Sequence, residues 1–86
     1  MWYVYILESQ KDKKWYTGIS NDLRKRFSQH ARGLSTWTKG RGPFELIYYE
    51  ASRDEYDARA REKYLKSGPG KLYIRKRLKR FLSLTG

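Results

Sequence analysis

Two polar side chains interrupt an apolar face near the start of this chain, and both can do chemistry. Arg26 and His30 are four residues apart in a segment with helical periodicity, so they lie on one side of that helix. They flank an apolar stripe of Leu23, Phe27 and Ala31, which directs them toward a sheet at the edge of the core. A guanidinium can bind phosphate through two hydrogen bonds, and an imidazole can take up a proton.

An ordinary structural interpretation exists for the same two residues. Asp22 precedes Arg26 by four positions, a spacing at which opposite charges pair on a helix surface. His30 would then be a hydrogen-bonded residue at the core boundary. The pattern alone favours this interpretation, because surface ion pairs are common and weak.

Glu62 is a third polar residue beside apolar ones. It borders Ala58 and Leu65 on one side of a later helical segment. An i, i+4 ion pair with Lys66 is a sufficient structural reason for it. A carboxylate at the core edge of a cationic chain could instead hold a divalent metal. Magnesium often uses only one or two protein carboxylates, and water and substrate phosphate complete its coordination.

Tyrosines are concentrated near the N-terminus, where Tyr3, Tyr5 and Tyr16 belong to two short runs of alternating aromatic and aliphatic residues. On pattern alone they are bulky residues that favour a sheet. Gly18 lies near the end of the second run, and a glycine there indicates a bulge or a close approach to the backbone. A phosphate lying against the Gly18 backbone, near a helix N-terminus, is the functional alternative.

The first half of the chain predicts two strands and a helix. Residues 2–8 and 14–20 alternate with the period of strands, and the polar turn between them predicts a hairpin. Ser20 or Asn21 can cap a helix that runs to about Arg32.

The second half predicts one more strand and two helices. Residues 44–50 are nearly continuously apolar, which indicates a central strand or one covered on both faces. Ser52 and Glu55 have the spacing of a capping box, and Gly68 ends the helix that they begin. A last helix starts at about Lys71. The predicted fold is therefore α+β, a small three-stranded antiparallel sheet flanked by about three helices in the order β-β-α-β-α-α.

Length and composition narrow the class of protein. A chain of 86 residues without repeats or linkers predicts one domain over residues 1–86. The absence of cysteine excludes disulfides and thiolate metal sites, and a single histidine excludes a histidine-rich zinc site. The apolar run from Trp2 to Leu7 is too short for a membrane span or a signal peptide, so a cytoplasmic protein is expected.

The charge predicts a polyanionic partner. Twenty Lys and Arg residues against nine Asp and Glu residues give a formal net charge of +11. Nucleic acid is the first candidate and an anionic membrane surface the second. The interleaved aromatic and basic loop and the basic last helix are either solvated faces or nucleic-acid contacts. The candidate contact residues are Trp37, Lys39, Arg41, Lys66, Arg75, Lys76 and Lys79.

Five motifs occur in an order that matches one known family. They are YVYIL at 3–7, WYTGIS at 15–20, DLRKRFSQH at 22–30, TKGRGPFELIYYE at 38–50 and AREKYLKSGPG at 60–70. With these motifs, which span nearly the whole sequence, the chain resembles the GIY-YIG nuclease superfamily, specifically its small stand-alone members. The N-terminal domain of an excinuclease looks like a larger relative, as do several homing and restriction endonucleases.

The resemblance implies a DNA endonuclease that hydrolyses phosphodiester bonds with one divalent metal ion, Mg²⁺ or Mn²⁺. Tyr5 and Tyr16 match the tyrosines of the two motifs that name the family. Arg26 matches its catalytic arginine, His30 the position one turn further on, and Glu62 its single metal-binding glutamate. The two motifs here lack the glycine and isoleucine of the first and the isoleucine of the second, although the tyrosines and Gly18 remain.

The chemistry requires a base, and a free phenol with a pKa near 10 is a weak one at neutral pH. We expect the surrounding cations to lower the pKa of the catalytic tyrosine. Tyr5 is favoured as the base, Tyr16 as the residue that positions water or phosphate, and His30 as the group that holds a tyrosine or receives its proton. The sequence does not decide which of the two tyrosines is the base.

The expected substrate is DNA selected by structure rather than sequence, such as branched or damaged DNA in repair or recombination. A partner protein could supply further specificity. The alternative is a catalytically silent nucleic-acid-binding module on the same fold, for which the cations alone would suffice.

Overall fold

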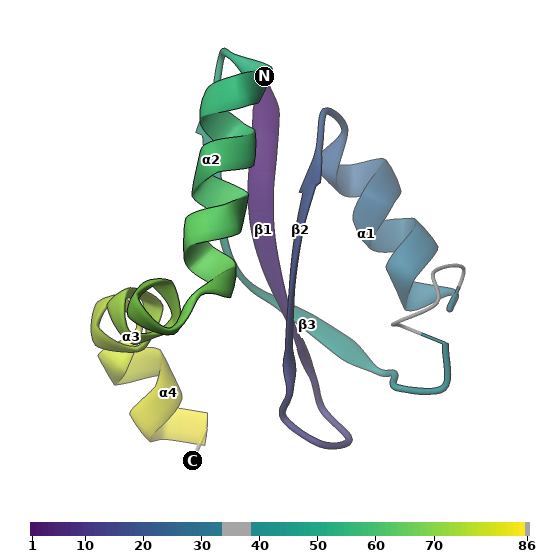
Figure 1. Cartoon of the computed structure of the whole chain (residues 1–86). Coiled ribbons are helices and arrows are strands. Elements are labelled where there is room, and N and C mark those ends of the chain that lie inside the picture. Colours follow the sequence, from purple (N-terminus) through teal and green to yellow (C-terminus); the bar gives the residue numbers. More distant parts are fainter. Residues whose placement is uncertain (34–38, 86) are drawn as a thin grey trace.

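The structure is a computed structural model that describes residues 1–33 and 39–85. Within them the elements follow the order β-β-α-β-α-α-α, and the predicted α+β fold is confirmed (Figure 1). The strands and helices are β1 Trp2–Ser9, β2 Trp15–Ser20, α1 Leu23–Ala31, β3 Phe44–Ser52, α2 Glu55–Lys66, α3 Gly68–Arg77 and α4 Lys79–Thr85.

The three strands form an antiparallel sheet in the order β2-β1-β3. The middle strand is thus β1, and the predicted central position of the third strand is wrong. β3 is an edge strand whose two faces both meet apolar groups, which explains its continuous apolar sequence. Tyr48 packs against the core on one face, whereas Leu46 and Tyr49 line a groove on the other.

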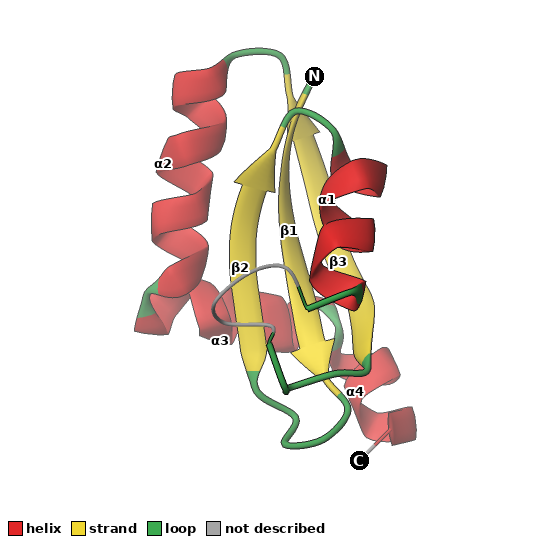
Figure 2. Cartoon of the chain, turned by 90° about the vertical axis from the view of Figure 1, so that its right-hand side faces the viewer, coloured by secondary structure: helices red, strands yellow, loops and turns green. Residues whose placement is uncertain are grey.

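The apolar core lies on the face of the sheet covered by α2 and α3. Val4 and Ile6 of β1 form a buried cluster with Ala58, Leu65 and Ile74 of these helices. In Figure 2, α1 lies in front of the sheet, α2 runs beside β2, and α3 lies behind. Burying side chains of this size contributes about 1.5–3 kcal/mol each, so this cluster is the main source of stability.

The helix α2 begins at a different cap from the one predicted. Asp54 is its N-cap, and its carboxylate accepts hydrogen bonds from the amides of Tyr56 at 2.8 Å and Asp57 at 3.2 Å. The predicted capping box fails because β3 extends through Ser52 and keeps that residue in the strand. An aspartate two residues on supplies the same kind of acceptor.

The last predicted helix is two helices, and the first of them starts earlier than Lys71. Ser67 caps α3, and Pro69 occupies its first turn, where a missing amide hydrogen costs nothing. Leu78 ends α3 in a non-helical conformation before α4 begins. None of the helices in the described ranges is long and apolar enough to cross a membrane.

A buried glycine allows α3 to turn back onto α2. A Cβ at Gly70 would lie 2.6 Å from the carbonyl carbon of Tyr64 and 2.7 Å from the Cα of Leu65. Both atoms belong to the backbone and cannot move aside as a side chain could. The close crossing of the two helices therefore requires glycine at position 70.

An arginine fastens β3 to the same two helices. The guanidinium of Arg61 donates two hydrogen bonds to the carboxylate of Glu50, each at 2.9 Å. It also lies over the rings of Tyr64 and Tyr73, at 5.3 and 5.4 Å from their centroids. These contacts tie an edge strand to α2 and α3 through one side chain.

The helix α1 packs on the opposite face of the sheet, and it does so through His30 rather than through its apolar stripe. Its N-cap is Asp22 rather than the predicted Ser20 or Asn21, and the Asp22 Oδ1 atom accepts from the Lys25 amide at 3.0 Å. His30 is fully buried, whereas Leu23 and Phe27 are half-buried and Ala31 is exposed. The side of α1 that faces the sheet is therefore the side of His30 and not the predicted side of Leu23, Phe27 and Ala31. The side chains of Leu23 and Phe27 lie at the edge of this contact.

Candidate active site

Two tyrosines and the histidine meet on the α1 face of the sheet. Tyr5 extends from the middle of β1 and is paired across the sheet with Gly18 of β2. Its hydroxyl is 2.8 Å from His30 Nε2. The imidazole lies near both phenols, with ring centroids 5.7 Å from Tyr5 and 4.9 Å from Tyr16. The structure thus brings together three residues that are distant in the sequence.

The reason for Gly18 lies in the Tyr5 side chain. A Cβ at Gly18 would collide with the Tyr5 hydroxyl and would lie 2.6 Å from the Tyr5 Cζ atom. It would also lie 3.0 Å from a ring carbon of Tyr16. The glycine therefore gives the buried phenol room to cross its neighbouring strand. Its predicted use as a place of phosphate approach stays a prediction.

Arg26 joins this cluster from α1. Burial lowers the pKa of Arg26, but the interactions of its guanidinium with the side chains of Tyr5 and Tyr16 outweigh burial and raise it. The guanidinium therefore lies close to both phenols. The expected surface pairing with Asp22 is replaced by this inward arrangement, because the Asp22 carboxylate caps the helix instead.

Gln29 is a member of the cluster that the periodicity assigned to the outer face. It is half-buried, and its Oε1 accepts a hydrogen bond from Arg26 Nη1 at 3.1 Å. This contact gives the guanidinium a partner on its own helix in addition to the two tyrosines. The i, i+3 spacing of the two residues was the signal that could have revealed the contact.

The pKa of Tyr5 moves opposite to the predicted direction. Burial raises it to about 12, because the phenolate would be poorly solvated inside the protein. The hydrogen bond with Arg26 lowers it, but by less than burial raises it. We expected the surrounding cations to prevail, and this expectation is wrong: Tyr5 holds its proton at neutral pH.

Burial also fixes the state of His30. It lowers the pKa of the imidazole to about 4, and the positive charge of Arg26 acts in the same direction. His30 is therefore neutral at pH 7. The Tyr5 hydroxyl and His30 Nε2 share one hydrogen bond of 2.8 Å, which Tyr5 donates when the imidazole carries its proton on Nδ1.

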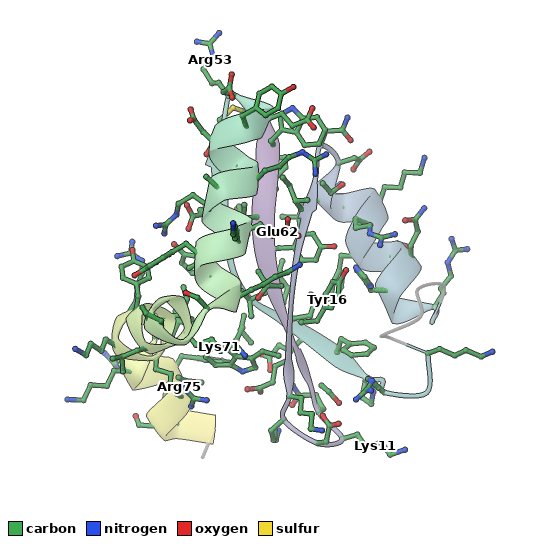
Figure 3. The ribbon with its side chains drawn as sticks, viewed as in Figure 1. Lys11, Tyr16, Arg53, Glu62, Lys71 and Arg75 are labelled. Carbon is green, nitrogen blue, oxygen red and sulfur yellow. The ribbon has the colours of Figure 1, made fainter. Side chains whose placement is uncertain are left out.

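Glu62 approaches this cluster from α2. In Figure 3 it lies on the side of α2 that faces the strands. Its charge acts on Tyr5 and raises the pKa of that phenol, which places the carboxylate within electrostatic reach of the cluster. The Glu62 side chain is 20% exposed, and Lys66 Nζ lies 3.3 Å from its Oε2 atom. The predicted i, i+4 pair is thus present.

The basic residues of the last helices have different environments. The guanidinium of Arg75 lies over the ring of Trp15, 5.1 Å from its centroid. Trp15 in turn donates a hydrogen bond to the buried carboxylate of Glu8 at 3.0 Å. Lys76 and Lys79 are exposed. Arg75 is therefore partly a packing residue, whereas the two lysines face solvent.

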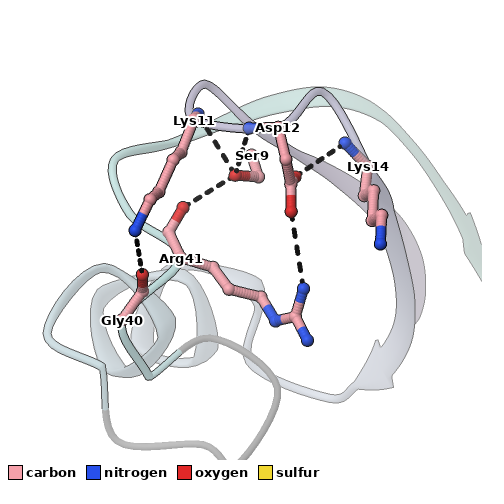
Figure 4. A network of polar contacts seen from close by, with 6 residues as sticks. All are labelled: Ser9, Lys11, Asp12, Lys14, Gly40 and Arg41. Carbon is pink, nitrogen blue, oxygen red and sulfur yellow. Dashed lines mark hydrogen bonds and ion pairs between the residues drawn. The ribbon is translucent and has the colours of Figure 1, made fainter.

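The loop before β3 is fastened to the hairpin turn between β1 and β2 (Figure 4). The buried Ser9 donates to the carbonyl of Arg41 at 2.7 Å, and Arg41 Nη1 lies 3.5 Å from Asp12 Oδ2. A hydrogen bond from the Lys14 amide lowers the pKa of Asp12 and keeps it charged beside Arg41. Lys39 is exposed, and Trp37 lies outside the described residues. Arg41 therefore has a structural role at this turn.

Comparison with known proteins identifies the family. The profile of the GIY-YIG catalytic domain matches residues 1–76. The chain is 45% identical over 65 residues to a UPF0213 protein from Clostridium perfringens, covering 74% of this chain and 69% of that protein. It is 38% identical over 65 residues to the UPF0213 protein YazA from Bacillus subtilis, covering 74% of this chain and 65% of the relative.

A solved structure agrees with this assignment. The solution NMR structure of a UPF0213 protein from Bacillus halodurans is 37% identical in sequence and has a TM-score of 0.50. The similarity covers 100% of this chain and 87% of that one. The chain therefore belongs to the GIY-YIG catalytic domain family, a family of nucleases, and its similar proteins include small UPF0213 proteins.

Proposed function

We propose that this protein is a metal-dependent DNA endonuclease that selects its substrate by structure and acts in repair or recombination. The observation that carries the proposal is the convergence of Tyr5, Tyr16, Arg26 and His30 in one cluster, in which Tyr5 and His30 are hydrogen bonded and Glu62 is in electrostatic reach. A protein that only bound DNA through its cations would not need two phenols, a half-buried arginine and a carboxylate in one place.

The side chains fit a metal that takes most of its ligands from elsewhere. In residues 1–33 and 39–85, no three His, Asp or Glu side chains gather as a closed metal site would require. Glu62 alone would hold the ion, once Lys66 turns away from its carboxylate. One carboxylate, with water and phosphate oxygens, is a usual set for Mg²⁺ or Mn²⁺. The ion would supply positive charge for the phosphate and the leaving oxygen.

Arg26 would bind the scissile phosphate. Its guanidinium is fully charged at any working pH, and Gln29 and the two tyrosines hold it in place. Two parallel donors match two non-bridging phosphate oxygens and stabilise the negative charge that grows on them in the transition state. Attack by water forms a bond from phosphorus to the water oxygen and breaks the bond to the 3′ oxygen.

The proton of the attacking water would pass through Tyr5. Since burial holds the Tyr5 pKa at about 12, the phenol is not a ready-made base. It can act as a relay: its oxygen takes the proton from water while its own proton moves to His30 Nε2, 2.8 Å away. A neutral His30 is the acceptor that this step requires. Tyr16, half-buried beside it, would position the water or the phosphate.

A nicking assay on supercoiled plasmid tests the proposal. The purified protein should nick DNA with Mg²⁺ or Mn²⁺, and Glu62→Gln and Arg26→Ala should each lower the rate about 100-fold or more. Glu55→Gln is the matched control, because Glu55 is a carboxylate of the same helix that lies about two turns from Glu62 and pairs with Arg59. It should nick like the wild type.

Two outcomes would overturn the proposal. Nicking that persists in both site variants would show that the cleavage arises elsewhere. Salt-sensitive DNA binding without cleavage under either metal would favour the catalytically silent binding module. Two features of the structure favour that outcome. Lys66 pairs with the Glu62 carboxylate that would bind the metal, and the raised pKa of Tyr5 keeps its phenol protonated.

A further inference from the structure

A groove of about 470 Å³ lies next to the cluster on the same face of the sheet. Its floor and walls come from β1, β3 and the first half of α1, and they include Tyr3, Arg24, Phe27, Leu46 and Tyr49. It exists because α1 packs through His30, so that Leu23 and Phe27 border the sheet without filling the space beside it. Its volume is in the range of pockets that hold small organic groups.

Aromatic rings dominate the walls of the groove. Tyr3 and Tyr49 contact one another across the two strands, with ring centroids 6.1 Å apart and planes inclined by 59°. Tyr49 leaves 54% of its surface exposed although it lies within a strand. A ring with one open side, next to a second ring and Phe27, is suited to stacking on a flat, uncharged ligand.

The polar groups of the groove favour a base over a phosphate. Asp22 is at its rim, and a carboxylate there would repel a phosphate group. One oxygen of this carboxylate caps α1, and Asn21 beside it offers both donors and acceptors. Such groups can pair with the edge of a nucleobase, while Arg24 attracts the backbone that carries it.

The groove is next to the proposed active site on the sheet. Tyr49 is paired directly with Tyr5 in the sheet, and Tyr3 is the next residue of β1 on the same face. Residues two apart on a strand are separated by about 7 Å, which is the length scale of one nucleotide in an extended chain. A strand whose phosphate lies at Arg26 would therefore place a neighbouring base on the open side of the Tyr49 ring.

We propose that this groove binds an unpaired nucleobase next to the scissile phosphate, so that the protein recognises DNA in which a base is free to leave the helix. The proposal rests on the proposed nuclease function for its choice of ligand. It adds what that function leaves open, namely how a chain of this size selects DNA by structure. Paired bases inside a duplex cannot enter the groove unless they unstack, which costs free energy.

The test measures binding without metal, so that it is independent of cleavage. Fluorescently labelled duplexes carry one extra unpaired nucleotide, an abasic residue at the same place, or no insertion, in buffer with EDTA. The wild type should bind the unpaired nucleotide roughly ten-fold tighter than the abasic control. Tyr49→Ala should lose this preference while keeping its affinity for the fully paired duplex, and Tyr49→Trp should keep it.

Tyr56→Ala is the matched control, because Tyr56 is an exposed tyrosine of α2, which packs on the other face of the sheet. It should bind like the wild type. Equal affinity of the wild type for the unpaired and abasic duplexes would overturn the inference. So would light scattering that finds a dimer that Tyr49→Ala converts to a monomer, since the groove would then hold a second copy of the chain.

Cleavage and binding together separate the two proposals. A base preference without cleavage would support the groove and overturn the nuclease. Cleavage without a base preference would support the nuclease and overturn the proposed role of the groove.

Discussion

The two faces of β1 are built for opposite purposes. Val4 and Ile6 point into the buried apolar cluster under α2 and α3, where their side chains are packed on all sides. Tyr5, between them in the sequence, points to the other face, where it forms a hydrogen bond with His30 and interacts with the charge of Arg26. One strand therefore stabilises the fold with its even residues and builds the candidate site with an odd one.

Substitutions and changes of pH should therefore affect the stability of the two faces differently. The apolar face depends on shape and should respond to added volume but not to pH. The polar face depends on proton positions and should respond to pH while tolerating changes of volume better. Substitutions on each face test this comparison, and each has a control on the same element or residue type.

The largest effect is expected at the crossing of α2 and α3. Gly70→Ala places a methyl group against the backbone of Tyr64 and Leu65, which cannot yield, so it should destabilise the fold by more than about 4 kcal/mol. Gly68→Ala is the control, because no atom lies within 4 Å of a Cβ there. Urea unfolding followed by circular dichroism measures both.

Gly18→Ala extends that contrast to the polar face. Its methyl group meets a side chain, the Tyr5 phenol, and overpacking of this kind costs about 1–3 kcal/mol. The double variant Gly18→Ala with Tyr5→Leu should recover part of the loss. If Gly18→Ala proves as damaging as Gly70→Ala, the two faces do not differ in the way described.

An intermediate effect is expected from the titration of His30. Its pKa is about 4 in the folded protein and about 6.5 in an unfolded chain, so the unfolded state binds the proton more readily between these values. Stability should be unaffected by this residue above pH 6.5 and should fall as the pH drops from 6.5 toward 4, by roughly 3 kcal/mol in total.

His30→Gln isolates that contribution. The glutamine oxygen can still accept from Tyr5 but does not titrate, so the variant should lose the part of the slope between pH 6.5 and 4 that the wild type shows. Unfolding free energies at several pH values give the comparison. Identical slopes in both proteins would contradict a buried neutral imidazole.

The smallest effect separates packing from phosphate binding among the basic residues. Arg75→Gln removes the contact with Trp15 and should lower stability by about 0.5–1 kcal/mol, whereas Lys76→Gln should change it by less than about 0.5 kcal/mol. If both residues contact phosphates, each substitution should lower the salt dependence of DNA binding by about one unit of slope. Equal stabilities of the two variants would show that the ring contact contributes nothing.

Local patterns in the sequence were sufficient for the strands, for the order of elements and for the direction of Arg26 and His30 toward the sheet. Spacing could not give the position of β3, because an edge strand with a packed face and a groove face has the same apolar sequence as a central one. Nor could spacing give the cap of α2. The cap is Asp54 rather than Ser52 because β3 extends through Ser52.

The electrostatics of Tyr5 was the least predictable feature. Counting the charges in the sequence suggested a lowered pKa, because the chain has many cations. Burial depends on how close α1 packs to the sheet, and this distance is set by contacts between residues far apart in the chain. In the folded protein burial outweighs the neighbouring arginine. That Tyr5, Tyr16 and His30 lie together was thus predictable, whereas the pKa of Tyr5 was not.

The central position of β1 also has a consequence for how the chain is made. β1 precedes every other element, and its hairpin with β2 can form as soon as Ser20 has been synthesised. Val4 and Ile6 stay uncovered until Leu65 and Ile74 follow, and an isolated hairpin is only marginally stable in water. Contacts this far apart in sequence slow folding, so the apolar side of the hairpin is open to chaperones or aggregation until Ile74 has emerged.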